Sequence, residues 1–332
     1  SSTSRGLGDV YKRQQMYRWR HGYRYVYRKI KYYSRMELPI VNHPDYVAKI
    51  NDDNKFPIKK FGALAENLLK SEIVKNFYIP KECSINTMKT SHSLEYINHI
   101  KNKTLDSKLQ KKIGFPINDS VVRRSFVATG GTVLASKLAL DYKLACNTAG
   151  GSHHANFDCG AGYCVFNDVA VAANYLKDKG YAKKILIVDL DVHQGNGNSE
   201  IFKNDRNVLT FSMHCESNYP AKKSKSDIDV ELKDNMEDEE YLNILNENLK
   251  KLNENFYDFV FYIAGVDIHF DDRLGKLKIS DDGINKRDQM VIESFYSKKI
   301  PLCGVLGGGY NRSFVKLIEL PVSYTHLRAH ET

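Results

Sequence analysis

From Leu144 onward, short runs of apolar and β-branched residues alternate with longer stretches in which apolar residues recur at helical spacing. The longer stretches, such as 169–179 and 239–255, have the length of helices. Strands that alternate with helices are typical of a mostly parallel sheet covered by helices on both faces. The pattern therefore predicts an α/β fold of three layers, αβα. The predicted strands are residues 144–148, 185–189, 208–213, 259–265 and 301–306.

The chain before Leu144 is more polar and its pattern is weaker. Helical spacing is present in residues 61–75 and 129–142, and the second stretch leads into the first predicted strand. Asp168 precedes an apolar helical stretch and is a candidate N-cap, and a further helix begins near Ser313. No linker, internal repeat or low-complexity tract divides the body. A single domain is therefore predicted, which is ordinary for 332 residues.

The net charge of +9 is concentrated at the N-terminus. Residues 1–35 contain ten basic residues and one acid, whereas the rest of the chain has 39 of each. The body therefore lacks the basic excess of a nucleic-acid binder, and we expect no direct nucleic-acid contact from it. Residues 1–35 also lack the apolar core of a signal peptide. We interpret them as a non-native or disordered segment, with a genuine basic arm for acidic partners as the alternative.

The last twelve residues, 321–332, have the same foreign character as the N-terminal segment. They interrupt the helix that begins near Ser313, so that helix is interpreted as truncated. The predicted domain accordingly covers residues 36–320, and the tail is interpreted as non-native.

No stretch approaches the ~18 apolar residues that cross a bilayer, so no membrane partner is expected. The six cysteines have no CxxC spacing, and the chain is much larger than a disulfide-stapled scaffold. We therefore expect most of them to be reduced core residues of a cytoplasmic protein.

Clusters of Gly, His, Asp and Tyr follow four of the predicted strands. In open α/β sheets, ligands bind beyond the carboxyl ends of the strands. The clusters are therefore expected to form one site. They are GGSHHA at 150–155, DLDVHQGNG at 189–197, AGVD at 264–267 and LGGGYN at 306–311.

Asp189, Asp191 and His193 stand at alternate positions, so all three face one side if the strand continues through them. Two carboxylates and an imidazole suit a divalent ion, and Asp267 is a candidate third protein ligand beside Asp191 and His193. Such an Asp-His-Asp set leaves one coordination position open, as catalytic zinc sites do. The alternative is that the two aspartates are helix-cap or turn residues.

His153 and His154 follow two glycines just after the strand at 144–148. Adjacent histidines on such a loop can reach different sides of one water molecule as acid and base; a polar loop with one capping histidine is the alternative. The glycines at 307–309 permit a close backbone approach. Tyr310 could then direct its hydroxyl at a carbonyl oxygen as negative charge develops, or it could simply be a core tyrosine.

Together and in this order, the clusters resemble the histone deacetylase superfamily over roughly residues 36–320. The segment DRLG at 272–275, with Ile279 and Ser280 beyond it, is similar to the class IV branch. The resemblance implies an arginase/deacetylase-like fold and a hydrolase that removes acetyl or longer fatty-acyl groups from lysine-like amides with a metal-activated water. The class IV likeness favours tolerance of long acyl chains. The implied ligands of one catalytic Zn²⁺ are Asp191, His193 and Asp267.

The resemblance also implies roles for the neighbouring residues. His153 and His154 flank the catalytic water, with His154 as the general base, and Tyr310 polarises the scissile carbonyl. Asp189 is the implied partner of His153, and Asn196 is that of His154. Because an amide stabilises an imidazolium less than a carboxylate does, His154 is expected to have the lower pKa of the pair.

The resemblance further implies a substrate tunnel and a second ion. Gly162 and Tyr163 match the segment that holds the acyl-lysine stem. A monovalent cation, usually potassium, is implied near Asp189. The choice of substrate depends on the shape of the tunnel and of rim loops such as 216–225. The spacing of residues in the sequence does not predict that shape.

Three other functions remain open. A deacetylase of small amides such as acetylpolyamines would use the same chemistry. A manganese ureohydrolase shares the fold but needs additional carboxylates for a second ion, where this chain has histidines. A catalytically silent acyl-lysine-binding module would retain the pocket alone, yet every expected catalytic residue is present.

Overall fold

The computed structural model describes residues 38–51 and 54–322. The predictions for the basic segment 1–35 and for most of the tail 321–332 concern residues outside these ranges. Within the described ranges, seven strands form one sheet in which every neighbouring pair is parallel. In spatial order they are β1 (Ile40–Val41), β2 (Leu144–Asn147), β7 (Leu302–Val305), β6 (Phe259–Ile263), β3 (Ile185–Asp189), β4 (Val208–Cys215) and β5 (Ile228–Leu232).

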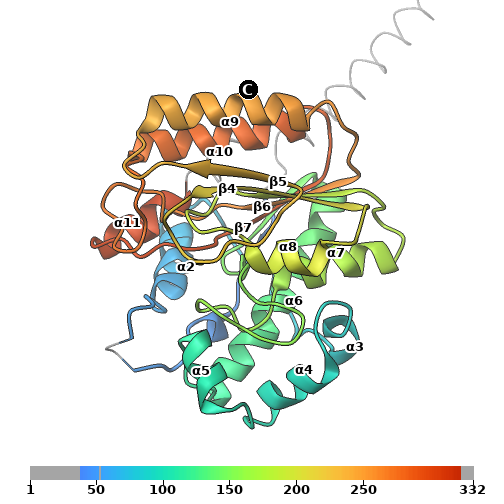
Figure 1. Cartoon of the computed structure of the whole chain (residues 1–332). Coiled ribbons are helices and arrows are strands. Elements are labelled where there is room, and N and C mark those ends of the chain that lie inside the picture. Colours follow the sequence, from blue (N-terminus) through green and yellow to red (C-terminus); the bar gives the residue numbers. More distant parts are fainter. Residues whose placement is uncertain (1–37, 52–53, 323–332) are drawn as a thin grey trace, which may run out of the picture. The chain divides into compact units, whose positions relative to one another are not determined.

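Helices cover both faces of this sheet (Figure 1), which confirms the predicted three-layer α/β fold. On one face lie α9 (Asp238–Leu252) and α10 (Asp281–Tyr296), and on the other α6 (Asp119–Tyr142), α7 (Asp168–Asp178) and α8 (Asn196–Phe202). The other helices of the described residues are α2 (Lys60–Lys70), α3 (Ile85–Met88), α4 (Leu94–Lys101), α5 (Ser107–Ile113), α11 (Phe314–Glu319) and the 3₁₀ turns η1 (Pro44–Tyr46) and η2 (Leu320–Val322).

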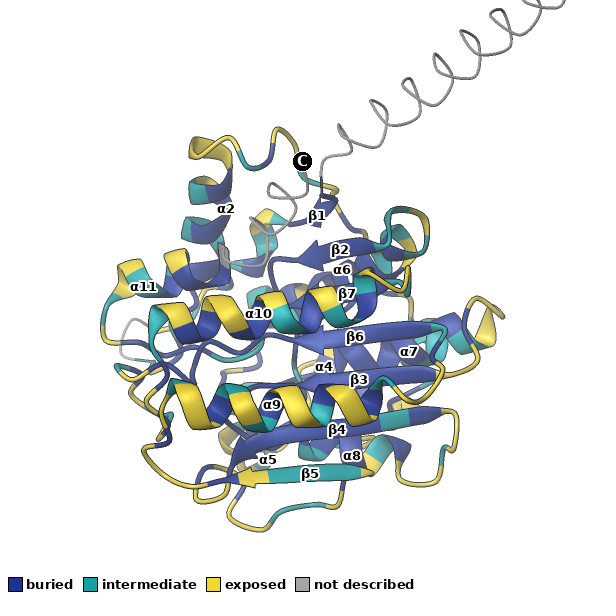
Figure 2. Ribbon diagram, turned by 90° about the horizontal axis from the view of Figure 1, so that it is seen from above, coloured by how far each residue is buried: buried dark blue, intermediate teal, exposed yellow. Residues whose placement is uncertain are grey.

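The central strands are buried on both faces, and successive side chains enter different cores. Ile185 and Ile187 pack with the alanine-rich faces of α6 and α7, whereas Leu186 and Val188 pack in the larger core that includes α9 and α10. Figure 2 shows the dark blue strands and the exposed outer surfaces of α9 and α10. Because successive side chains of a strand point to opposite faces of the sheet, neighbouring residues pack into different cores.

Four strands that carry the polar clusters are consecutive in the sheet. Asn147 of β2 pairs with Val305 of β7, Val305 pairs with Ile263 of β6, and Ile263 pairs with Asp189 of β3. Since these are the last residues of four parallel strands, the loops that follow them leave the same edge of the sheet. The fold therefore brings the four clusters together.

Some predicted local details are wrong. Asn167, not Asp168, caps α7, because its side chain accepts a hydrogen bond from the Ala170 amide. Helix α6 begins at Asp119, earlier than the predicted residue 129, and β1, β5 and α10 were not predicted. Ser313 does cap α11, through a hydrogen bond from the Lys316 amide.

The six cysteines are free thiols, and all but Cys159 are buried, as predicted. No helix in the described part of the chain combines the length and apolarity that a bilayer span requires.

Candidate active site

Two aspartates and one histidine converge beyond β3 and β6. The strand β3 ends at Asp189, so it does not continue to His193; in the turn that follows, Asp191 Oδ1 accepts a hydrogen bond from the His193 amide at 3.0 Å. His193 Nδ1 lies 3.0 Å from Asp191 Oδ1 and 3.2 Å from Asp267 Oδ2. One candidate ligand atom from each side chain lies within 4.8 Å of the others, and within the described ranges this is the one such group.

The burial and donor chemistry of this group suit a divalent cation. Asp191, His193 and Asp267 are all buried, and unpaired charges are costly in such a place. Burial and the neighbouring Asp191 carboxylate raise the pKa of Asp267 to about 7. A cation among the three side chains would remove this repulsion, and two carboxylates with one imidazole are a zinc donor set.

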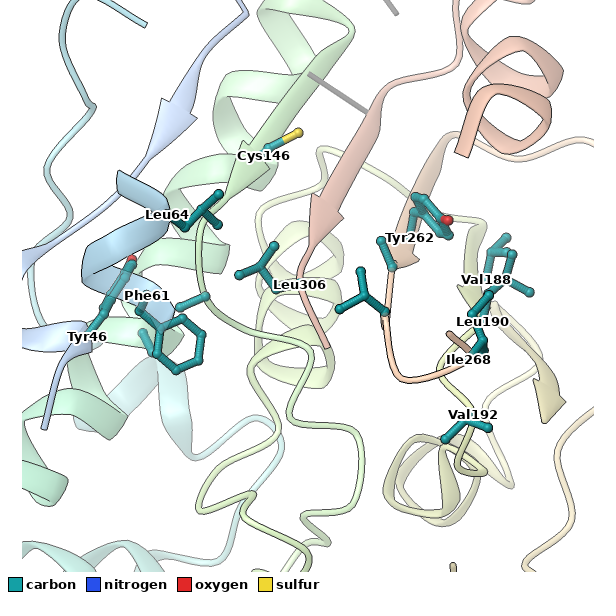
Figure 3. Close-up of a cluster of buried hydrophobic side chains, with 14 of the residues drawn as sticks. Tyr46, Phe61, Leu64, Cys146, Val188, Leu190, Val192, Tyr262, Ile268 and Leu306 are labelled. Carbon is teal, nitrogen blue, oxygen red and sulfur yellow. The ribbon is translucent and has the colours of Figure 1, made fainter. Parts of the chain in front are cut away.

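The apolar residues between the polar ones keep this turn in place. Leu190 and Val192 are fully buried, and Figure 3 shows them with Val188, Tyr262 and Ile268 in one apolar cluster. The alternation that predicted the polar face therefore persists beyond the end of the strand.

Gly308 allows the loop after β7 to approach the two carboxylates. Its amide donates a hydrogen bond to Asp191 Oδ2 at 2.6 Å. A Cβ atom at this position would lie only 2.0 Å from Asp267 Oδ2. Any other residue would therefore displace a candidate metal ligand.

His153 and His154 lie side by side after β2, with ring centroids 4.1 Å apart. His153 Nδ1 is 2.7 Å from Asp189 Oδ2, and His154 Nδ1 is 2.7 Å from Asn196 Oδ1. Because both partner oxygens are acceptors, each Nδ1 carries the hydrogen and each Nε2 is left to act elsewhere. The structure thus brings together the two histidines and the partners assigned to them from the sequence.

The surroundings of the two histidines shift their pKa values in opposite directions. Burial would lower the pKa of His153, but the carboxylates of Asp189 and Asp191 outweigh burial and raise that pKa to about 9. Burial, together with the nearby His153 and His193 rings, holds the pKa of His154 well below its usual range. His154 is therefore the neutral member of the pair, in the sense that the sequence predicted.

Asp168 holds the histidine loop from behind. Its buried carboxylate accepts hydrogen bonds from the Gly151 amide at 3.1 Å, the Ser152 amide at 2.8 Å and the Thr132 hydroxyl at 2.5 Å. From the sequence, Asp168 was predicted only to be a helix cap. Its carboxylate instead positions the backbone just before His153.

Tyr310 follows β7, and its backbone is held from both sides. Its amide donates to Asp272 Oδ2 at 2.6 Å, and its carbonyl accepts from Arg273 Nε at 2.9 Å. The ring centroid lies 6.4 Å from that of His193, and the side chain is buried. Burial and the nearby aspartates raise the pKa of Tyr310, so its hydroxyl stays protonated and can donate.

Aromatic side chains form the approach to these residues. Gly162 has a φ of 53°, and a Cβ there would lie 2.6 Å from His154 Cδ2. The Tyr163 ring lies 5.9 Å from that of Tyr310. The Tyr219 ring lies 4.8 Å from that of His154 at 84°, and the sequence analysis did not single it out. In the sequence, only the position of Tyr219 in the rim loop 216–225 pointed to a role at the site.

Two cavities meet at this point. The outer cavity has a volume of about 620 Å³ and is lined by His154, Tyr163, His193, Tyr219 and Tyr310, among others. The inner cavity, lined by Asp191 and His193 among others, has a volume of about 30 Å³. Its walls include three residues that the sequence analysis missed, Phe56, Phe61 and Arg124.

Comparisons with known proteins find a matching family and several relatives. Residues 55–320 match the histone deacetylase domain family. The chain is 41% identical over 298 residues to an uncharacterized protein of Picosynechococcus sp., covering 89% of this chain and 98% of that protein. It is 32% identical over 283 residues to histone deacetylase 2 of Arabidopsis thaliana, covering 79% and 71%.

The fold is also similar to solved structures of low sequence identity. The HD domain of HDA15 superposes with a TM-score of 0.76 at 20% identity, covering 89% of each chain. An HDAC homolog crystallised with SAHA gives a TM-score of 0.76 at 23% identity, covering 90% of this chain and 85% of that one. These likenesses support the fold.

Proposed function

The chain belongs to the histone deacetylase family, and from that premise we propose that it is a zinc-dependent hydrolase that removes acyl groups from lysine-like amides. One observation carries the proposal. Asp191, His193, the histidine pair and Tyr310 line the small inner cavity, and His154, His193 and Tyr310 also line the outer one. Asp267 lies directly behind this wall, against His193.

Asp191, His193 and Asp267 would hold the ion. When bound there, Zn²⁺ supplies a Lewis acid that polarises the amide carbonyl and acidifies a water molecule. The potassium ion implied near Asp189 would be held by main-chain carbonyls and by Asp189, because each carboxylate oxygen keeps a lone pair besides the hydrogen bond it accepts from His153 or from the Asp191 amide.

His154 would act as the general base. Its Nδ1 hydrogen is directed at Asn196, so the Nε2 lone pair can take a proton from the attacking water. His153, held by Asp189, would stay protonated beside it and stabilise developing negative charge. The paired rings thus divide the roles of base and electrostatic partner.

Tyr310 would donate its hydroxyl hydrogen to the carbonyl oxygen as this oxygen becomes negative. The water oxygen bonds to the carbonyl carbon, the carbon–nitrogen bond breaks, and the histidine pair returns a proton to the leaving amine. The products are a carboxylate and a free amine.

The size of the inner cavity favours a substrate with a short acyl group. A substrate stem that enters through the outer cavity and places its carbonyl near Tyr310 would direct its acyl group inward. The inner volume of about 30 Å³ is far smaller than the outer volume of about 620 Å³. A fatty-acyl chain would need Phe56 and Phe61 to move, so the cavity favours acetyl over the long chains that the class IV likeness suggested.

Amine release by the full chain, supplied with one equivalent of Zn²⁺, tests the proposal. The substrates are one peptide sequence carrying acetyl, octanoyl or myristoyl lysine, and an acetylated polyamine. We expect the acetyl peptide to be cleaved fastest. Tyr310→Phe should lower kcat by about 10² to 10³, the cost of removing one oxyanion donor.

Stoichiometric zinc binding by folded protein without cleavage of any substrate would contradict the proposal and favour a silent binding module. Cleavage of the acetylated polyamine alone would identify a small-amide deacetylase. Preference for myristoyl over acetyl would show that the inner cavity opens.

A further inference from the structure

The outer cavity is surrounded by lysines although the body of the chain has no net charge. Lys55, Lys111, Lys112 and Lys276 line this cavity, and no aspartate or glutamate among the described residues does so. All four lysines are exposed. Residues 36–332 contain equal numbers of basic and acidic residues, so this excess is local to the mouth.

Lys111 and Lys112 are fixed to the tunnel wall. They occupy the last turn of α5, whose end accepts hydrogen bonds from the tunnel segment: Lys112 O from the Gly162 amide at 3.1 Å, and Ile113 O from the Tyr163 amide at 2.7 Å. The two ammonium groups therefore lie at the entrance of the tunnel that leads to the catalytic residues.

A different segment of the cavity wall carries Lys276. Its Nζ donates to Ser217 Oγ at 2.9 Å, and the Lys276 amide donates to Asn218 Oδ1 at 3.2 Å. These bonds tie its loop to the segment that bears Tyr219. Asp234 lies 3.9 Å from the Lys276 ammonium, so this lysine is partly neutralised.

A further segment of the cavity wall carries Lys55. Asn54 donates to Gly114 O at 3.1 Å, and Lys55 O accepts from Arg273 Nη2 at 3.4 Å. Lys55 carries less weight than the α5 pair, because Asp52 and Asp53 precede it in the sequence and lie outside the described residues. Neither Lys55 nor Lys111 forms an ion pair with any described residue.

We propose that this lysine ring selects acyl-lysines flanked by acidic residues in a peptide or protein. The inference rests on the proposed deacylase function and identifies its substrate class. A lysine stem in the tunnel places the neighbouring peptide residues at the mouth, where flanking carboxylates meet the four ammonium groups. Acetylated polyamines keep cationic amines, and the same ring repels them.

The test compares acetyl-lysine peptides with two aspartates, two serines or two arginines on each side, at low and at physiological salt. Exposed ion pairs are individually weak, so several together should give about a tenfold higher kcat/KM for the acidic than for the neutral peptide. The difference should lie mainly in KM and should shrink as salt is added.

Lys111→Glu with Lys112→Glu should reverse the order of acidic and basic peptides, and the glutamine pair should reduce the preference without reversing it. Lys250 and Lys251 form a matched control, because they occupy the same place in the last turn of α9 and are also exposed. Their double glutamate variant should keep the wild-type preference. Equal kcat/KM for the three peptides would overturn the inference, as would an acetylated polyamine that rivals the acidic peptide.

Binding separates this inference from the proposed function. Fluorescence anisotropy with labelled acidic, neutral and basic acetyl peptides on the metal-free full chain reports recognition without catalysis. A preference for the acidic peptide in this assay, with no hydrolysis by the zinc-loaded chain, would support the lysine ring and contradict the deacylase. Hydrolysis without any preference among the peptides would support the deacylase and contradict the lysine ring.

Discussion

Arg287 is a fully buried charge that supports a candidate metal ligand from behind. Its Nη1 donates to Gly265 O at 2.5 Å, two residues before Asp267, and its Nε donates to Asp288 Oδ1 at 2.9 Å. Tyr262 also donates to Asp288 Oδ1. Arg287 therefore links α10 to the loop that carries Asp267, although in the sequence it stands in a charged stretch that looks exposed.

Replacing this arginine tests that link. Arg287→Met should lower the free energy of unfolding by about 3–5 kcal/mol, because it removes the positive charge beside the buried Asp288 carboxylate. Urea unfolding of the metal-free protein measures this loss, and calorimetric zinc titration should also show weaker binding. Arg287→Met with Asp288→Asn should recover part of the stability. An unchanged free energy in the single variant would contradict the link.

His92 should make the fold sensitive to acid. Its ring is buried, Nε2 accepts from the Asn167 amide at 2.9 Å, and Nδ1 lies 2.8 Å from Asn156 O. The ring is thus neutral, and burial lowers the pKa of His92 to about 4. Below about pH 6.5 the unfolded chain takes up a proton that the folded chain excludes, so stability falls as pH drops from 6.5 toward 4, by about 3 kcal/mol in all.

Urea unfolding of metal-free protein at pH 7 and pH 5 checks this prediction. His92→Gln should lose this part of the pH dependence, whereas His99→Gln, at a partly exposed position on α4, should retain it. The same acid sensitivity in the wild type and in His92→Gln would contradict the assignment.

The residues that carry the chemistry were predictable where they sit in dense clusters. His153, Asp191 and Tyr310 each follow a strand-length apolar run, so pattern alone placed them at strand ends. Phe56 and Phe61 were not predictable, because they come from a polar region with weak periodicity and reach the site only through tertiary packing. Their place in the cavity wall depends on distances in the folded structure, which the spacing of residues in the sequence does not give.

At the level of elements, the alanine-rich face of α7 determines how closely this helix packs on the sheet. Ala170, Ala172 and Ala173 are fully buried with Ile187 and Phe261 of the central strands. Small side chains on one face let a helix backbone approach the pleated strands. An extra methylene group there has no free volume to enter.

Enlarging one of these alanines should destabilise the fold. Ala172→Leu should cost about 1–3 kcal/mol through overpacking, measured by urea or thermal unfolding. Asp178→Leu, an exposed position on the same helix, should change stability far less. Equal effects of the two substitutions would show that the α7 face is loosely packed.

The predictability of the elements follows their amphipathic character. Residues 169–179 and 239–255 have clear helical periodicity and correspond to α7 and α9. Helix α10 was not predicted, since its buried Arg287 and Asp288 break the apolar stripe that would have identified it. Strand β1 has only two residues, too few for any pattern.

At the level of the whole molecule, strand order creates the site. The four strands that precede the polar clusters are consecutive in the sheet, although β2 and β7 are far apart in the sequence. The sequence predicted a parallel sheet and one site at its carboxyl edge, and both are present. It did not predict the order of the strands, because that order depends on which helices cover which face.

The most direct test of this account is acetate release from an acetyl-lysine peptide by the full chain as Zn²⁺ is titrated in, with Asp267→Asn measured in parallel. We predict no release without metal, saturation at one Zn²⁺ per chain, and a loss of both tight zinc binding and release in Asp267→Asn, because one ligand and its charge are removed. Acetate release that is unaffected by chelation, or that persists undiminished in the folded Asp267→Asn protein, would contradict a zinc-dependent deacylase built on this site.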